Sequence, residues 1–130
     1  MRKTGPLFAR KPIYVVDDDL SMRRSLERLL RKHGFDAVAF DSAAALLRYG
    51  CIEEACCIVL DINLNGESGI SLRRRLASEG ATTPVIYITG NDCQANQVAA
   101  IQSGCAAYLA KPFAASALID SIERACADHG

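Results

Sequence analysis

The hydrophobic positions of the chain follow two alternating patterns from residue 13 onward. Short runs rich in β-branched residues alternate with longer stretches whose apolar residues recur with the period of a helix. This order is typical of an α/β domain with a parallel sheet. The predicted strands are residues 13–16, 36–40, 57–60, 85–88 and 107–109. The third and fourth runs are apolar throughout, as expected for strands covered on both faces.

Five helices are predicted from apolar spacing and from capping residues. The first begins at a cap, Asp19 or Ser21, and ends before Gly34, with a stripe of Met22, Leu26, Leu29 and Leu30. The other four are expected near residues 43–49, 70–79, 92–103 and 114–127. Residues 12–127 therefore form one predicted domain, with a basic tail over 1–11 and a short end over 128–130.

The composition narrows the classes of protein that this sequence fits. Of 130 residues, 50% are apolar and 23% charged, so a folded domain is expected rather than disorder. Fifteen basic side chains balance fifteen acidic ones, which argues against direct binding to nucleic acid or to an anionic membrane. No apolar stretch approaches membrane-spanning length. The six cysteines lack metal-site spacing, so we expect reduced thiols and a cytoplasmic location, with no role assigned to Cys56 and Cys57.

Polar side chains of matching type follow four of the predicted strands. These side chains are Asp17, Asp18 and Asp19 after the first strand, Asp61 after the third, Thr89 after the fourth and Lys111 after the fifth. Each has an ordinary structural explanation when taken alone, as a helix cap, a strand end or a surface residue. Parallel strands, however, deliver their following loops to one edge of the sheet, where ligands bind. We therefore expect these groups to gather.

Gathered carboxylates would need a counterion. Two carboxylates within about 5 Å repel by roughly 3 kcal/mol at an effective dielectric constant near 20. A divalent cation would relieve this repulsion, and a ligand set made only of oxygen favours Mg²⁺ or Mn²⁺ over Zn²⁺. Lys111 and Thr89 add a cation and a hydroxyl that suit phosphoryl oxygens. The predicted site is therefore suited to a phosphoryl group and Mg²⁺.

Motifs at four strand ends resemble those of the receiver domains of bacterial two-component response regulators. They are Val15-Val16-Asp17-Asp18-Asp19, the Asp61 loop ending at Gly69, Ile88-Thr89-Gly90, and Ala110-Lys111-Pro112-Phe113. The resemblance covers about residues 12–127, with the motifs in the family's order. It implies a doubly wound, flavodoxin-like sheet of strand order 2-1-3-4-5 with helices on both faces. Its switch point would lie between the strands that carry Asp17 and Asp61.

The resemblance also implies a chemical role for several residues. Asp61 would be the phosphoacceptor, taking the group in line from a phosphohistidine of a sensor histidine kinase or phosphotransfer protein. Asp17, Asp18, Asp61 and the backbone carbonyl of Asn63 would hold Mg²⁺. Lys111 would neutralise a phosphoryl oxygen. The domain would catalyse only its own phosphorylation and slow dephosphorylation, so it is not expected to be a metabolic enzyme.

A conformational switch is a further implication of the resemblance. In receivers Thr89 and Gly90 would contact the phosphoryl group, and Tyr108 would rotate as Thr89 moves. The output surface would be the fourth helix, fifth strand and fifth helix, which could also support a phosphorylation-dependent homodimer. Tyr108 is equally well explained as an amphipathic aromatic at a sheet edge. The Lys111–Pro112 peptide is expected to be cis, as is frequent in the family.

Some details depart from the family pattern or leave alternatives open. Leu64-Asn65 replaces the usual Met-Pro, while Asn63 and Asn91 occupy positions that tune dephosphorylation in the family. One alternative is a haloacid dehalogenase-type phosphohydrolase with an Asp17-x-Asp19 nucleophile motif. Another is a pseudo-receiver that only mediates interaction or dimerisation. The sequence resembles receivers that precede a helix-turn-helix domain, but a stand-alone receiver or a relay protein fits it too.

Overall fold

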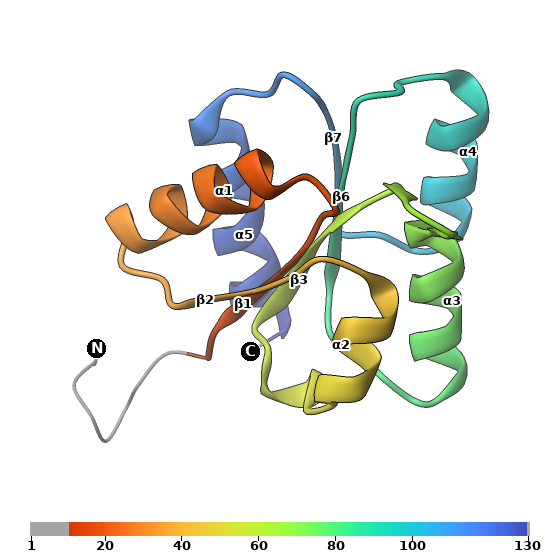
Figure 1. The fold of residues 1–130 in the computed structure, drawn as a ribbon, viewed down its shortest axis with the longest axis horizontal. Coiled ribbons are helices and arrows are strands. Elements are labelled where there is room, and N and C mark those ends of the chain that lie inside the picture. The colour runs from red at the N-terminus through yellow and green to blue at the C-terminus, as the bar shows by residue number, and fades with distance from the viewer. Residues whose placement is uncertain (1–10, 130) are drawn as a thin grey trace.

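A five-stranded parallel sheet forms the centre of the molecule (Figure 1). The computed structural model describes residues 11–129, so residues 1–10 of the predicted tail and Gly130 lie outside it. The strands are β1 (Ile13–Val16), β2 (Ala37–Phe40), β3 (Cys57–Asp61), β6 (Val85–Thr89) and β7 (Ala107–Ala110). Their order is β2-β1-β3-β6-β7, which confirms the predicted order 2-1-3-4-5.

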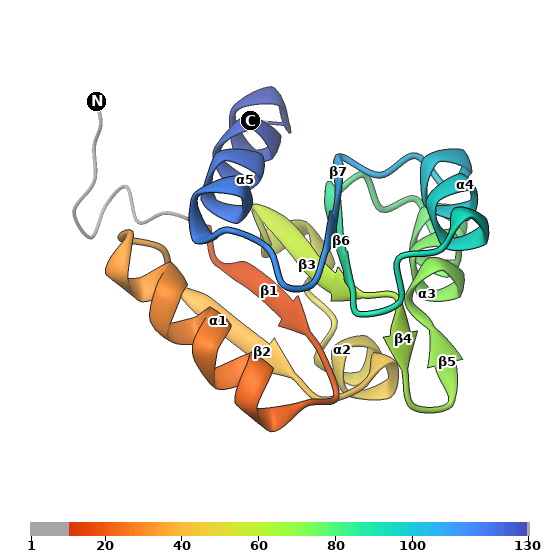
Figure 2. The same cartoon turned by 90° about the horizontal axis from the view of Figure 1, so that it is seen from above.

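Helices cover both faces of the sheet (Figures 1 and 2). They are α1 (Leu20–Lys32) and α5 (Ala115–His129) on one face, with α2 (Ala43–Tyr49), α3 (Gly69–Ser78) and α4 (Gln94–Gln102) on the other. Because side chains alternate along a strand, Ile13 and Val15 pack under α1 and α5, while Tyr14 and Val16 pack under α2 and α3. No helix within residues 11–129 is long and apolar enough to cross a membrane.

Three short features were not predicted from the sequence. A 3₁₀ turn, η2 (Ile52–Glu54), precedes β3. The strands β4 (Asn63–Leu64) and β5 (Glu67–Ser68) form a hairpin directly after β3. Its turn is Asn65-Gly66, where Gly66 has a φ of 81°, and such an Asn-Gly turn favours a tight hairpin. Two-residue strands are too short to produce a detectable hydrophobic period, so the pattern gave no sign of them.

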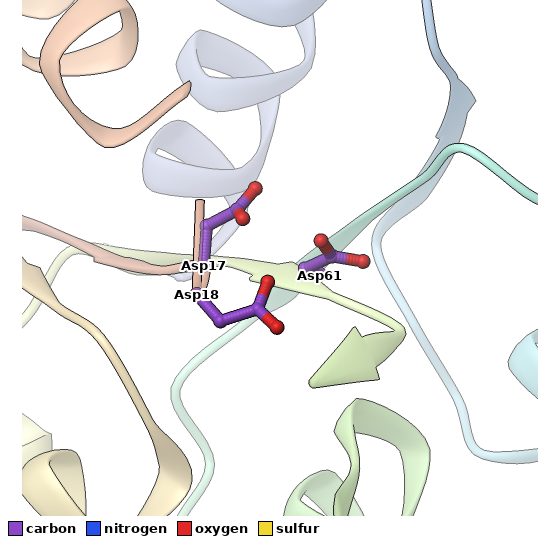
Figure 3. A group of neighbouring side chains, drawn as sticks. All are labelled: Asp17, Asp18 and Asp61. Carbon is purple, nitrogen blue, oxygen red and sulfur yellow. The ribbon is translucent and has the colours of Figure 1, made fainter. Parts of the chain in front are cut away.

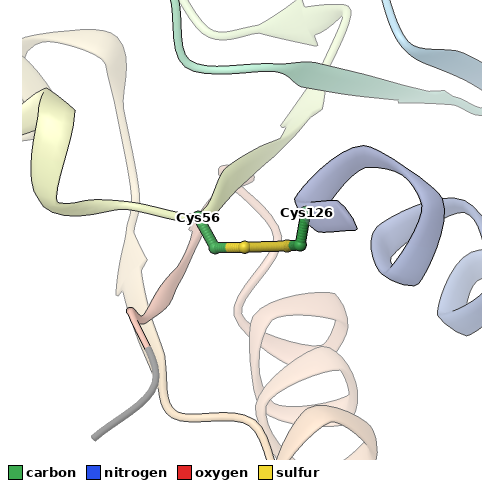
Figure 4. Close-up of a disulfide and its surroundings, with 2 residues drawn as sticks. All are labelled: Cys56 and Cys126. Carbon is green, nitrogen blue, oxygen red and sulfur yellow. A yellow bond between two sulfur atoms is a disulfide. The ribbon is translucent and has the colours of Figure 1, made fainter. Parts of the chain in front are cut away.

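The prediction of six reduced cysteines is wrong for two of them. Cys56, just before β3, forms a disulfide with Cys126 on α5 (Figure 4). Their Cα atoms are 5.5 Å apart, within the usual range for this bond. Seventy positions separate the two residues in sequence, so only the packing of α5 beside β3 brings them together. The other four cysteines are free thiols.

Candidate functional site

Three aspartates lie together at the carboxyl edge of the sheet (Figure 3). Asp17 and Asp18 directly follow β1, and Asp61 is the last residue of β3, the strand beside it. One carboxylate oxygen of each lies within 4.8 Å of those of the other two. Asp17 and Asp61 are buried, while Asp18 is half-buried. The predicted gathering of these carboxylates at the switch point is therefore confirmed in position.

Local turns fix the orientation of the two buried carboxylates. The backbone N–H of Asp19 donates to Oδ1 of Asp17 at 2.9 Å, and the N–H of Asn63 donates to Oδ1 of Asp61 at 2.9 Å. Both are bonds from residue i+2 back to an aspartate, a turn that this short side chain favours. Arg23 on α1 also donates to the carbonyl of Asp17 at 2.8 Å. The other oxygen, Oδ2, of each carboxylate remains directed at the shared site.

Lys111 lies between the two buried carboxylates. Its Nζ donates to Oδ2 of Asp17 and to Oδ2 of Asp61, both at 3.1 Å. The backbone N–H of Lys111 donates to the carbonyl of Thr89 at 2.7 Å, which fixes the loop after β7 against the end of β6. The Lys111–Pro112 peptide is cis, as predicted. A single ammonium therefore neutralises part of a concentrated negative charge.

Burial and mutual repulsion disturb the protonation equilibria of the site. Burial raises the pKa of Asp61, the Asn63 N–H lowers it, the charge of Asp17 raises it, and Lys111 lowers it, with a net upward shift. Burial lowers the pKa of Lys111, but its hydrogen bond and charge interactions with Asp61 and Asp17 outweigh this and raise it. Lys111 therefore carries its positive charge at neutral pH, and the charged form of Asp61 is held at an energetic cost.

The chemistry of this cluster fits a hard divalent cation. Three carboxylates and one ammonium leave a formal charge of −2 when all are ionised. The cluster has only oxygen donors, the ligand type that Mg²⁺ and Mn²⁺ prefer. Asp17, Asp18 and Asp61 are the side chains that would hold such an ion. The Asn63 carbonyl stays a predicted ligand.

Thr89 connects the carboxylate cluster to the neighbouring loops. Its hydroxyl is fully buried, donates to Oδ1 of Asn63 at 3.1 Å, and accepts from the N–H of Asn91 at 3.0 Å. A Cβ added at Gly90 would lie 4.0 Å from Cδ of Lys111, so Gly90 borders the same site. The side chain of Asn63, for which only a backbone role was predicted, therefore also reaches Thr89.

Tyr108 on β7 faces a different partner. Its hydroxyl donates to Oδ1 of Asp92 at 3.0 Å, and Nε2 of Gln97 donates to the same oxygen at 2.7 Å. Asp92 precedes α4 and Gln97 lies on it, so this oxygen joins β7 to the start of α4. Asp92 was not singled out from the sequence, because an exposed aspartate before a helix has the ordinary appearance of a cap.

The Asp92 contact leads to a prediction about the ionisation of Tyr108. Partial burial, then the hydrogen bond to Asp92 and the Asp92 charge, raise the pKa of Tyr108 to about 12. Asp92→Asn removes the charge, so we expect the pKa to fall toward the ordinary value near 10 without reaching it. Tyrosine ζ-carbon NMR titration checks this shift. Asp120→Asn, on α5, is the control, and an unchanged pKa in Asp92→Asn would contradict the contact.

Comparison with known proteins identifies the family. The family model described as the response regulator receiver domain matches residues 13–123. The chain belongs to the response-regulator receiver family. This receiver is 39% identical over 110 residues to Nodulation protein W of Bradyrhizobium diazoefficiens, covering 85% of the chain and 48% of that protein. It is 38% identical over 111 residues to the transcriptional regulatory protein FixJ of Azorhizobium caulinodans, covering 85% of the chain and 53% of that protein.

Solved structures give the same assignment. The receiver superimposes on the response regulator StyR with a TM-score of 0.84 and 37% identity, over 92% of this chain and 60% of that one. This chain spans about half the length of the first two curated relatives. Receivers generally bind Mg²⁺ at an acidic pocket, and Asp17, Asp18 and Asp61 form such a cluster here. The family match leaves no support for a haloacid dehalogenase-type phosphohydrolase.

Proposed function

We propose that this receiver is a phosphoacceptor switch whose acceptor is Asp61. A single observation carries the proposal: a buried carboxylate at a strand end lies within 3.1 Å of a lysine ammonium and beside two further carboxylates. Such an arrangement costs stability when no divalent cation is bound. A function that uses the clustered charges explains why the protein contains this arrangement. Residues 12–127 would form the switch.

The proposed reaction transfers a phosphoryl group from a phosphohistidine to the Asp61 carboxylate. The bond between carboxylate oxygen and phosphorus forms as the phosphorus–nitrogen bond breaks, and the imidazole leaves. Lys111 is placed to neutralise the charge of a phosphoryl oxygen, and the Thr89 hydroxyl to donate to another. When bound, Mg²⁺ would add further neutralisation of the phosphoryl oxygens. Water later attacks the phosphorus and releases phosphate.

The signalling partners follow from this chemistry. Receivers interact with histidine kinases or phosphotransfer proteins, and we propose such a protein as the phosphoryl donor. We place the exchange in the cytoplasm, and propose no direct contact with nucleic acid or membrane for this domain. A phosphoryl group on Asp61 would draw the Thr89 hydroxyl away from Asn63. Rotation of Tyr108 away from Asp92 would then alter the surface of α4, β7 and α5 and could support a homodimer.

Incubation with acetyl phosphate tests this function directly. The purified chain is incubated with and without Mg²⁺, and the intact mass is recorded before and after hydroxylamine. We expect a gain of one phosphoryl group that requires Mg²⁺ and that hydroxylamine removes, as for an acyl phosphate. No gain from acetyl phosphate or from a histidine kinase, in a folded protein, would instead support the pseudo-receiver alternative.

Metal binding gives a second prediction that does not depend on phosphorylation. A ligand that binds only the folded state stabilises it, so Mg²⁺ at ten times its dissociation constant is expected to raise Tm by about 5 °C. Asp18→Asn should lose most of this shift, since Asp18 is a half-buried member of the carboxylate cluster. Differential scanning calorimetry checks both proteins. An equal shift with NaCl of the same ionic strength would mean charge screening rather than a site.

A further inference from the structure

The Cys56–Cys126 pair joins two elements at the end of the sheet remote from Asp61. Cys56 immediately precedes β3, whereas Asp61 is the last residue of that strand. Five residues of extended chain place the two ends about 16 Å apart. Cys126 lies in the last part of α5, and both cysteines are half-buried (Figure 4). The phosphoacceptor and the cysteine pair are therefore separate sites on one strand.

The surroundings of the pair favour thiol chemistry between these two sulfurs alone. Their Cα separation of 5.5 Å suits an intramolecular bond, and partial exposure gives small thiols and disulfides access. The adjacent Cys57 points into the core between β3 and α5, and burial raises its pKa to about 12. A buried thiol that resists ionisation is a poor nucleophile, so Cys57 does not compete.

We propose that Cys56 and Cys126 form a reversible redox modification site that responds to the disulfide state of small thiols such as glutathione. One thiolate attacks oxidised glutathione and expels one reduced glutathione, and the second thiolate attacks the mixed disulfide and expels another. Two thiols are oxidised and one glutathione disulfide is reduced. Reversibility rests on the proposed cytoplasmic function, because disulfides in that compartment are usually transient or redox-sensing.

The bond would control how firmly the end of α5 is attached. Leu118, Ile119, Ile122 and Ala125 on α5 are buried against the sheet. The exposed Ala127 follows Cys126, so the disulfide is the last strong attachment of the helix within the described side chains. Oxidation therefore fixes the final turns of α5 to the start of β3. After reduction, the attachment given by the described side chains is the apolar packing of these four residues. Since α5 belongs to the proposed output surface, the redox state would be read at that surface.

Equilibration in glutathione buffers tests the site. The full chain is incubated anaerobically in buffers from fully reduced to fully oxidised glutathione, quenched with an alkylating agent and analysed by intact mass and peptide mapping. We expect the 56–126 disulfide to be absent in the reduced buffer and present in the oxidised one. The oxidised protein should melt about 10 °C higher than the reduced one, as for a cross-link closing a long loop. Amide exchange after Ile122 should slow about tenfold.

Cysteine-to-serine variants test whether the redox response belongs to the Cys56–Cys126 pair. Cys56→Ser and Cys126→Ser should each lose the redox dependence of Tm, whereas Cys93→Ser, which removes a half-buried free thiol before α4, should keep it. Asp61→Asn should titrate like the native chain, so a failure of phosphorylation does not affect this test. A disulfide that persists in reduced glutathione, thiols that stay free in oxidised glutathione, or a cross-linked dimer as the main product would each overturn the proposal.

Discussion

Replacing Asp61 with asparagine is expected to reduce phosphoryl uptake from acetyl phosphate at least about a thousandfold, to the background of unspecific labelling. The carboxylate is the proposed nucleophile, and an amide oxygen of the same shape carries no charge to attack phosphorus. A thousandfold loss corresponds to about 4 kcal/mol of the activation barrier. Intact mass spectrometry over a time course, with Mg²⁺ present, measures the rate for both proteins.

Asp41→Asn is the matched control for this experiment. Asp41 also follows a strand of the same sheet, β2, but it is exposed, and it is not one of the three clustered carboxylates. We expect this variant to take up one phosphoryl group at the native rate. Labelling of Asp61→Asn at the native rate would show that the acceptor is another residue. Loss of labelling in both variants would point to a general effect of charge instead.

Asp61→Asn should also stabilise the folded protein when Mg²⁺ is absent. Burial and the charge of Asp17 raise the pKa of Asp61 in the folded state, despite Asn63 and Lys111. The Asp61 carboxyl group therefore holds its proton more tightly in the folded protein than in the unfolded chain. The native protein loses stability as the pH rises through the folded-state pKa of Asp61. Asparagine resembles the neutral carboxylic acid. Asp61→Asn should therefore be more stable than the native chain at pH 7, and this difference should be absent below about pH 4, the pKa of aspartate in the unfolded chain. Urea unfolding at both pH values measures this difference.

The charges of the carboxylate cluster explain why Lys111 alone cannot take the place of Mg²⁺. Lys111 contacts Asp17 and Asp61 equally, at 3.1 Å, but the structure places its Nζ with those two carboxylates and not with Asp18. Its charge cancels one of the three negative charges. The pKa of Asp61 stays raised even with this lysine in place, because burial, together with the charge of Asp17, outweighs the lowering by the Asn63 N–H and by Lys111. The excess of negative charge would favour the binding of Mg²⁺, and a bound Mg²⁺ would offset the charge of an incoming phosphoryl group.

The carboxylate cluster could be predicted from the sequence because the geometry of a parallel sheet constrains it. Asp17 and Asp61 follow strands that pair directly, so only the strand order had to be correct for their side chains to meet. The apolar runs located the strands to within one residue, since a buried strand must be apolar. The position of Lys111 follows from the same argument, and its cis peptide from the family resemblance.

Contacts between side chains of different loops could not be predicted in this way. The bonds from Thr89 to Asn63 and from Tyr108 to Asp92 depend on rotamers and loop paths, which leave no period in the sequence. Cys126 meets Cys56 only because α5 lies beside the start of β3. A hydrophobic pattern specifies which face of a helix is buried, but it does not specify which residue lies opposite. The roles of Thr89 and Tyr108 in switching therefore stay proposals.

Gly69 ends the Asp61 loop and directly precedes the helix predicted near residues 70–79, and the structure gives it a specific packing role. A Cβ at this position would clash with the carbonyl oxygen of Asp61 and would lie 3.1 Å from Cα of Ile62. Both are backbone atoms, and the N–H of Gly69 also donates to the carbonyl of Ile62 at 2.8 Å. The start of α3 is thus packed directly on the segment that carries Asp61, the proposed acceptor.

Gly69→Ala is therefore expected to lower the free energy of unfolding by about 3 kcal/mol, the cost of forcing a methyl group into closely packed backbone. The labelling rate of Asp61 should fall as well, because the segment must shift to admit the methyl group. Gly90→Ala is the control, since its Cβ would meet only Cδ of Lys111 at 4.0 Å, and its stability should change by less than about 1 kcal/mol. Urea unfolding measures both variants. Equal stability of Gly69→Ala and the native chain would mean that α3 can move away from Asp61 at little cost. Such a result would contradict the rigid support of the proposed acceptor by α3.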